Sequence, residues 1–140
     1  MFCYEQDITM LKNIKFKDGL LDTRIAGHPV LIILVTDTYF YYLTMSSSSR
    51  RIAEKHPSQY YALTKDNANK LRVPISYVNL KNVYQQEIAN YIPRGKVKQK
   101  KYQAIIKNLK IYQHDIEEDN VYTRIKEYLW TKLLNSIVVF

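Results

Sequence analysis

The chain has 140 residues and a mass of 16.7 kDa, and 21 Lys and Arg residues against 13 Asp and Glu residues give a formal charge of +8. A chain of this length buries roughly two-thirds of its unfolded surface, so one domain over residues 1–140 is expected to fold without disulfides or a structural metal. The single cysteine, Cys3, excludes an internal disulfide and a cysteine-based zinc cluster, and the longest aliphatic run, residues 30–35, is too short to span a membrane. We therefore expect a cytoplasmic protein with no membrane partner.

The first third of the chain is predicted to form β-strands. Residues 2–6 are a short candidate strand, and residues 30–36, which contain the aliphatic run, are typical of a strand buried on both faces. Pro29 suits the start of that strand, where a missing N–H has little effect. Residues 37–38 form a tight turn, after which residues 39–43 return as the second arm of a hairpin.

The middle of the chain is predicted to add further strands. The four serines at 46–49 are expected to form a loop that ends the hairpin. Residues 59–64 and 71–78 are predicted strands, and residues 83–89 form either one more strand or a helical turn. The Pro-Arg-Gly sequence at 93–95 is interpreted as the boundary between this β-rich part and a helical tail.

The tail has the periodicity of two amphipathic helices. From Lys96 onward the apolar residues recur at helical spacing. These residues are Tyr102, Ile105, Ile106, Leu109 and Tyr112. A second helix is predicted after Asn120, and its inner face carries Val121, Tyr122, Ile125, Leu129 and Leu133. Together these elements predict an α+β fold, with a barrel or sheet of five to seven strands followed by two helices.

The positive charge is concentrated in one stretch of the chain. Residues 88–114 contain no acidic residue and carry seven Lys and Arg residues. These are Arg94, Lys96, Lys98, Lys100, Lys101, Lys107 and Lys110. Tyrosine supplies 13 of the 18 aromatic residues, and rings beside cations favour binding of RNA or single strands, by stacking on bases and neutralising phosphates. The alternative interpretation is a solvated helix face.

A second group of residues has the types that phosphate chemistry requires. The segment from Thr44 through the serines at 46–49 ends in Arg50 and Arg51, so hydroxyls and guanidinium groups follow the end of a predicted strand. His28 stands at a strand entrance and is a natural proton shuttle near neutral pH. The alternatives are a flexible loop and a surface histidine. With only three glycines the chain has no phosphate-binding loop, and we predict no cofactor and no metal.

The order of these features resembles the toxins of type III toxin–antitoxin systems. The resemblance rests on the short aromatic first strand, the Gly-His-Pro sequence before the aliphatic strand, the Leu-Thr-Met-Ser sequence at 43–46 and the basic helical tail. These toxins are relatives of the Kid/PemK/MazF endoribonucleases, and this chain is most similar to the CptN/TenpN branch, with ToxN and AbiQ as cousins.

The resemblance implies a compact SH3-like β-barrel with peripheral amphipathic helices, two of them C-terminal. It also implies a metal-independent endoribonuclease that cleaves cellular mRNA. The partner that it implies is a small repetitive antitoxin RNA, folded as a pseudoknot, which the toxin cuts from a precursor and then holds in a basic groove.

The resemblance also assigns roles to individual residues. Thr44 and Ser46 match the family's phosphate-positioning hydroxyls, His28 matches a basic residue at the entrance of the long strand, and Tyr4 matches a tyrosine of the first strand. ToxN-like members continue with Pro-Lys, whereas this chain has further serines and then Arg50, so the resemblance leaves open whether Ser47, Ser48 or Arg50 stands in place of the family's lysine.

The chemistry expected of these residues is RNA transesterification. The catalytic set is His28, Thr44, Ser46, Ser48 and Tyr4. His28 would act as base or acid, the hydroxyls would donate to phosphate oxygens, and the products would be a 2′,3′-cyclic phosphate and a 5′-OH. The RNA-binding set is Ser47, Arg50, Arg51, Arg94, Lys96, Lys98, Lys100, Lys101 and Lys107.

Two other functions are compatible with the same residues. One is a non-catalytic RNA-binding module, in which the basic tract only docks on structured RNA. The other is a MazF-like mRNA interferase that is neutralised by a protein antitoxin.

Overall fold

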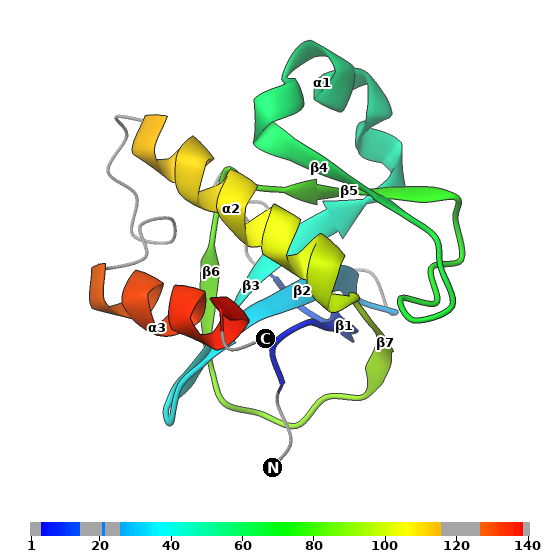
Figure 1. Ribbon diagram of the computed structural model, residues 1–140. Helices are drawn as coiled ribbons and strands as arrows, with labels where there is room; N and C mark the ends of the chain where they lie inside the picture. Colours follow the sequence, from blue (N-terminus) through cyan, green and yellow to red (C-terminus); the bar gives the residue numbers. More distant parts are fainter. Residues whose placement is uncertain (1–3, 15–20, 22–25, 116–126, 139–140) are drawn as a thin grey trace.

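The structure is a computed structural model that describes residues 4–14, 21, 26–115 and 127–138. Within these ranges the fold is α+β, as predicted (Figure 1). The strands are β1 (Asp7–Leu11), β2 (His28–Val35), β3 (Tyr39–Ser46), β4 (Tyr60–Thr64), β5 (Ile75–Asn79), β6 (Tyr84–Glu87) and β7 (Pro93–Lys96). The α-helices are α1 (Arg50–Lys55), α2 (Gln99–Asp115) and α3 (Glu127–Val138), and two 3₁₀ turns cover Ser47–Ser49 and Pro57–Gln59.

The strands pair antiparallel in the order β4-β5-β3-β2-β1-β7, and β6 pairs with β3. β3 is the branch point of the sheet. Its first half pairs with β6, from Tyr39 opposite Glu87 to Tyr42 opposite Tyr84, whereas Met45 and Ser46 pair with β5. The strand pairings of the described residues do not close the sheet into a barrel.

The β4–β5 connection nevertheless approaches the opposite end of the sheet. The backbone N–H of Lys96 on β7 donates to the carbonyl oxygen of Ala68 at 2.9 Å. Ala68 belongs to the turn after β4, so one backbone hydrogen bond links the two ends of the strand order. This contact brings together two surfaces that strand order alone would keep apart.

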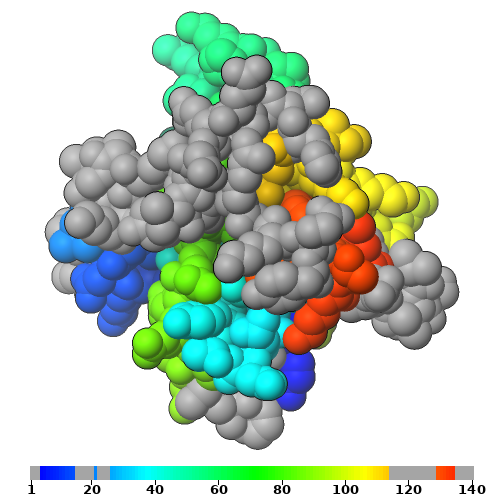
Figure 2. All heavy atoms as spheres, turned by 90° about the vertical axis from the view of Figure 1, so that its left-hand side faces the viewer, coloured from blue at the N-terminus to red at the C-terminus, as the bar shows by residue number. Residues whose placement is uncertain are grey.

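Alternation along β2 and β3 gives the sheet two apolar faces. Leu31, Leu43 and Met45 point to one face, which we call the helix-covered face, because α2 and α3 pack on it (Figure 1). Figure 2 shows α3 between α2 and the cyan tip of the β2–β3 hairpin. The opposite face carries a second cluster that includes Val30 and Phe40, and we call it the second face.

The helix-covered face is filled mainly from α2. Its apolar residues Tyr102, Ile105, Ile106 and Leu109 are fully buried, which confirms the periodicity read from the sequence. Tyr102 also donates its hydroxyl proton to the carbonyl oxygen of Ile33, so the one polar atom of this ring is satisfied inside the core. On α3, Leu129 and Leu133 are buried as predicted. Val121, Tyr122 and Ile125 lie outside the described residues.

The hairpin and the strand at 59–64 were predicted correctly. The strand predicted at 71–78 is present but covers only Ile75–Asn79, and the first helix of the tail begins at Gln99, since Lys96 still belongs to β7. β5 begins at Ile75, directly after Pro74, because proline cannot donate to a neighbouring strand. Residues 83–89 contain a strand, β6, whose Tyr84 ring stacks on Tyr42 with centroids 5.5 Å apart. This cross-strand pair stabilises the extended conformation of β6, whose other residues are polar.

Three predictions about local structure were wrong. The first strand is β1, not residues 2–6: Gln6 has a φ of +77°, which extended backbone does not adopt, and residues 1–3 lie outside the described ranges. The serine segment is not a loop but a 3₁₀ turn that leads into α1, because the Ser46 side chain accepts a hydrogen bond from the Ser48 N–H and caps it. Residues 93–95 are not a boundary but part of β7, which pairs with β1.

Candidate functional site

The β2–β3 hairpin places three of the predicted catalytic residues at one end of one face. Thr44 lies opposite Val30 in the register, and His28 lies two residues before Val30. Ser46 lies two residues after Thr44. Since side chains two residues apart share a face, His28, Thr44 and Ser46 all belong to the second face.

A close glycine contact fixes where β2 begins. Gly27 has a φ of +86°, and a Cβ built on it would lie 2.8 Å from the carbonyl oxygen of Leu11. His28 follows at once and pairs with Leu11 in the register. Only glycine fits this backbone conformation and this approach, so Gly27 sets the position at which His28 joins the sheet.

The serine turn forms a compact group of hydroxyls. The Oγ atoms of Ser46 and Ser48 lie 2.7 Å apart and share a hydrogen bond, and the Ser48 N–H donates to Ser46 Oγ at 3.1 Å. Ser48 is exposed and Ser46 is half-buried, whereas Thr44 retains 8% exposure. The two serines therefore present donors to solvent, while the threonine hydroxyl lies deeper in the strand.

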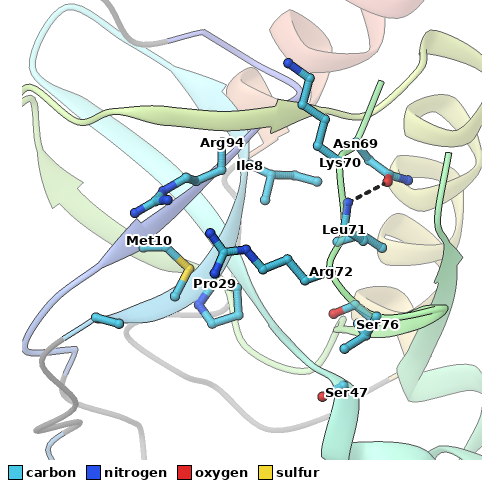
Figure 3. Close-up of a pocket in the computed structure, with 12 residues that line it drawn as sticks. Ile8, Met10, Pro29, Ser47, Asn69, Lys70, Leu71, Arg72, Ser76 and Arg94 are labelled. Atoms are coloured by element: carbon cyan, nitrogen blue, oxygen red, sulfur yellow. Dashed lines mark hydrogen bonds between the residues drawn. The ribbon is translucent and has the colours of Figure 1, made fainter. Parts of the chain in front are cut away.

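A cavity of about 270 Å³ opens beside this turn, on the helix-covered side of the sheet. Ile8 and Met10 from β1 and Pro29 from β2 form its apolar wall, and Ser47 and Ser76 contribute hydroxyls (Figure 3). The residues from Asn69 to Val73, in the β4–β5 connection, line another side. The cavity thus lies where β1, β7, the serine turn and the β4–β5 connection meet.

Two arginines from different elements lie over the apolar wall. Figure 3 shows Arg72, from the β4–β5 connection, and Arg94, from β7, extending over Met10 and Pro29. Both side chains are exposed, and among the described residues no carboxylate forms a salt bridge with either one. Two guanidinium groups that no described carboxylate compensates, at the mouth of an apolar cavity, favour the approach of an anion.

Of the residues predicted from the sequence, Ser47 and Arg94 line this cavity. His28, Thr44 and Ser46 belong to the opposite face of the same hairpin. The serine turn joins the two regions, because Ser46 and Ser47 are consecutive and their Cα atoms are only about 3.8 Å apart. The cluster of serine hydroxyls and the cavity therefore lie next to each other at the end of β3.

Tyr4 lies in a different place, in a polar cluster beside β1 and β7. Its N–H donates to the Tyr91 hydroxyl at 3.0 Å, and that hydroxyl donates to Asp7 Oδ2 at 2.7 Å. Lys96 Nζ lies 3.9 Å from Asp7 Oδ1 and 5.6 Å from the centroid of the Tyr4 ring. A predicted catalytic residue and a predicted RNA-binding residue are thus in contact.

This cluster is separated from His28 by the length of β2. The Gln6 N–H donates to the Ile32 carbonyl oxygen, and Glu5 accepts from the Val35 N–H, so the segment beside Tyr4 lies against the far half of β2. Four residues of strand between His28 and Ile32 correspond to about 13 Å. The structure does not bring Tyr4 and His28 together.

The arginines of α1 follow the serine turn directly. Arg50 Nε lies 3.1 Å from Glu54 Oε1, in an exposed i,i+4 ion pair on the helix. Arg51 is exposed, and no described carboxylate is paired with it. Of the two, Arg51 therefore offers the less compensated positive charge, since Glu54 offsets that of Arg50.

The predicted lysines around α2 divide into two kinds. Lys98, Lys100 and Lys107 are exposed. Lys101 is instead part-buried, with its Nζ 2.7 Å from Asp66 Oδ2 and 3.1 Å from the Thr64 carbonyl oxygen. Its ammonium group fastens α2 to the end of β4, so its charge is already compensated within the fold.

The contact with Lys101 changes the pKa of the Asp66 carboxylate. The hydrogen bond from Lys101 lowers the pKa of Asp66 from 3.8 to about 2, with further help from the Asn69 and Ala68 N–H groups. Those two N–H groups donate to Asp66 Oδ1 at 2.8 and 2.9 Å, respectively. Asp66 thus orders the turn that leads to Arg72 while it holds α2.

The sequence did not point to Arg72, Lys70 and Met10, all of which line the cavity. Two cations close together at 70 and 72 were a weak signal for the first two. No sequence pattern links residue 72 to residue 94 or to residue 10, because their proximity depends on long-range pairing.

The described ranges hold no metal-binding cluster and no membrane-spanning helix. Within them no group of three His, Cys, Asp or Glu side chains is placed to hold a metal ion, and no described helix is long and apolar enough to cross a membrane. No protein-family model and no curated protein matches the chain.

Proposed function

We propose that this protein is an endoribonuclease toxin that cleaves RNA without a metal ion and is inhibited by a small antitoxin RNA. The observation that carries the proposal is that the serine turn connects the hydroxyl pair directly to the cavity. Ser46 and Ser48 share a hydrogen bond, and Ser47, which lies between them, lines a cavity flanked by Arg72 and Arg94. Donors for phosphate oxygens thus adjoin a cationic cavity.

We further propose that the fold is a variant of the SH3-like barrel. Two features support this: β3 is shared by two sets of strands, and the turn after β4 bonds to β7 through Lys96 and Ala68. Both bring the ends of the strand order toward each other, as a small barrel requires.

The chemistry proposed is an internal transesterification. A base removes the proton of the 2′-OH, the bond between O2′ and phosphorus forms, and the bond between phosphorus and O5′ breaks as O5′ takes a proton. His28 serves as base or acid, and water supplies the other transfer. The Ser46 and Ser48 hydroxyls donate to the phosphate oxygens, which gain charge in the transition state.

The partner proposed is RNA, both as cellular mRNA substrate and as antitoxin. Support comes from the exposed cations around β7 and α2, namely Arg94, Lys96, Lys98, Lys100 and Lys107. Exposed cations of this kind neutralise backbone phosphates and make affinity depend on salt. Lys101 contributes least to this surface, since it is paired with Asp66.

The test is cleavage of a labelled RNA by the purified protein, with mapping of the product ends and with EDTA added in parallel. We expect 2′,3′-cyclic phosphate and 5′-OH ends and full activity in EDTA. Ser46→Ala combined with Ser48→Ala is expected to lower kcat by about 10²–10³, the usual effect of losing transition-state donors. Ser58→Ala, an exposed serine of the second 3₁₀ turn, is the matched control. Activity that EDTA abolishes, or that the double variant retains in full, would refute the proposed mechanism.

A second candidate function is RNA binding without cleavage. The separation of Tyr4 from His28 favours it, because these two predicted catalytic residues do not share a site. Expression of the chain alone separates the two functions. If the protein is a nuclease, the parent chain arrests growth and His28→Ala or Thr44→Ala relieves the arrest. If it only binds RNA, neither the parent chain nor these variants arrest growth. A MazF-like interferase would instead be relieved by a small acidic protein.

A further inference from the structure

We infer that the cavity between Arg72 and Arg94 is a binding subsite for one unpaired nucleotide, with its base on the apolar wall and its phosphate between the two arginines. The inference deepens the proposed function, on which it rests for the view that the ligand is a segment of RNA. The cavity and its side chains argue for a nucleotide on their own.

The size of the cavity suits one nucleotide. At about 270 Å³ it lies just below the roughly 300–1,000 Å³ of typical small-molecule sites. A duplex cannot enter such a space, and an unpaired base can leave its strand to do so. The ligand is therefore one splayed nucleotide rather than a paired segment.

The wall of the cavity suits a flat ring. Ile8 is buried, and Met10 and Pro29 are half-buried, so they form an apolar surface that still faces the cavity. Figure 3 shows the Met10 side chain beneath the two arginines. A methionine sulfur is polarisable and contacts aromatic rings favourably, which fits a base laid against it.

The two arginines suit a phosphate. A guanidinium group binds phosphate oxygens through two parallel N–H donors, which a single lysine ammonium does not match. Arg72 and Arg94 reach the cavity mouth from different elements, so one phosphate between them receives donors from two sides. No carboxylate of the described residues pairs with either arginine, so within that part of the chain no internal anion competes for them.

The cavity is also held in shape before any ligand arrives. Asn69, on the loop that carries Arg72, donates to the Thr64 carbonyl oxygen at 2.8 Å and accepts from the N–H groups of Asp66 and Leu71. A preformed loop loses little conformational freedom on binding, which increases affinity. The amide oxygen of Asn69 and one of its two Nδ2 protons are engaged within the loop, so Ser47 and Ser76 supply further hydrogen-bonding groups for a base.

The experiment is calorimetric titration of the purified chain with uridine and adenosine 3′-monophosphates, the matching nucleosides and inorganic phosphate. We expect each nucleotide to bind at least about tenfold more tightly than its nucleoside or inorganic phosphate alone, because both the apolar wall and the arginines contribute. Arg72→Gln and Arg94→Gln should each weaken nucleotide binding by about tenfold, the usual effect of losing one charged hydrogen-bond partner. Met10→Ala should weaken nucleotide binding without changing phosphate binding.

Lys55→Gln is the control, since Lys55 is an exposed cation at the end of α1 and does not line the cavity. Thermal unfolding of each variant shows whether it is folded. Equal affinity for inorganic phosphate and nucleotide would reduce the cavity to an anion site, and unchanged affinity in Arg72→Gln would place the nucleotide elsewhere. Either result overturns the inference.

RNA cleavage is measured separately, so that the two proposals fail independently. Nucleotide binding that depends on Arg72, in a protein that cleaves no RNA, would support the subsite and refute the nuclease. Cleavage whose KM is unaffected by Arg72→Gln would support the nuclease and refute the subsite. If both are right, Arg72→Gln raises KM more than it lowers kcat.

Discussion

Gly95 on β7 lies directly against the backbone of Asn69: a Cβ on Gly95 would fall 2.1 Å from the Asn69 carbonyl oxygen. The next residue, Lys96, donates its N–H to Ala68 at 2.9 Å. The strand that carries Arg94 and the loop that carries Arg72 are therefore in contact backbone to backbone. This contact decides how far apart the two arginines of the cavity are.

Gly95→Ala is expected to destabilise the protein and to separate the two arginines. Since the clashing atom is a backbone oxygen, either β7 or the loop must move, at a cost of about 1–3 kcal/mol in the free energy of unfolding. Chemical denaturation measures this cost, with Ser58→Ala as the neutral comparison. An alanine variant as stable as the parent would show that the loop can move away from the added Cβ without a measurable loss of stability.

Asp66→Asn is expected to change how stability responds to acid. The folded-state pKa of Asp66, about 2, lies below its ordinary value of 3.8, so its charged form stabilises the fold above about pH 4. That contribution is lost as pH falls from about 4 through 2. The asparagine variant should therefore be less stable at neutral pH and lose less stability across this interval.

The control for that experiment is Asp66→Ala. Asparagine keeps a side-chain oxygen for the Ala68 and Asn69 N–H groups, whereas alanine removes both this acceptor and the charge. Thermal unfolding from pH 2 to pH 7 compares the three proteins. Parallel curves for the parent and the asparagine variant would show that the Lys101 contact does not govern acid stability.

The exposed lysines and Lys101 are expected to behave differently toward RNA. Lys98, Lys100 and Lys107, changed together to Gln, should weaken RNA binding and reduce the slope of log K against log salt by about 0.7 for each phosphate that is no longer neutralised. Lys101→Gln should instead lower stability and leave that slope unchanged, because its ammonium group already contacts Asp66. Binding titrations at several salt concentrations measure both, and equal slopes for the two variants would contradict the division.

Tyr91→Phe is expected to destabilise the fold. The Tyr91 hydroxyl both donates to the buried Asp7 carboxylate and accepts from the Tyr4 N–H, so its removal leaves Asp7 short of a partner. Loss of a partner to a buried charged group costs about 1–3 kcal/mol. Tyr39→Phe removes a phenolic hydroxyl from another half-buried tyrosine and is the comparison for chemical denaturation. Equal stability of the two variants would mean that Asp7 finds another donor.

Much of the fold was predictable because its signals are local. The aliphatic run of β2 can be read within a few residues, and so can the helical period of Tyr102, Ile105 and Leu109 in α2. The serine turn was misread although its signal is also local. Serines are common in loops, but Ser46 acts here as a cap for the helical turn that follows.

The α+β class, the β2–β3 hairpin and the basic tract can be read from the order of the residues alone, and so can the choice of His28 and the serines as candidate site residues. Tertiary structure alone decided that 93–95 is a strand, since β7 exists through its pairing with β1, more than 80 residues away in the chain. It also decided that Arg72 and Arg94 flank one cavity while Tyr4 lies apart from His28. Periodicity reports which face a residue occupies, but only packing between distant segments determines which faces meet.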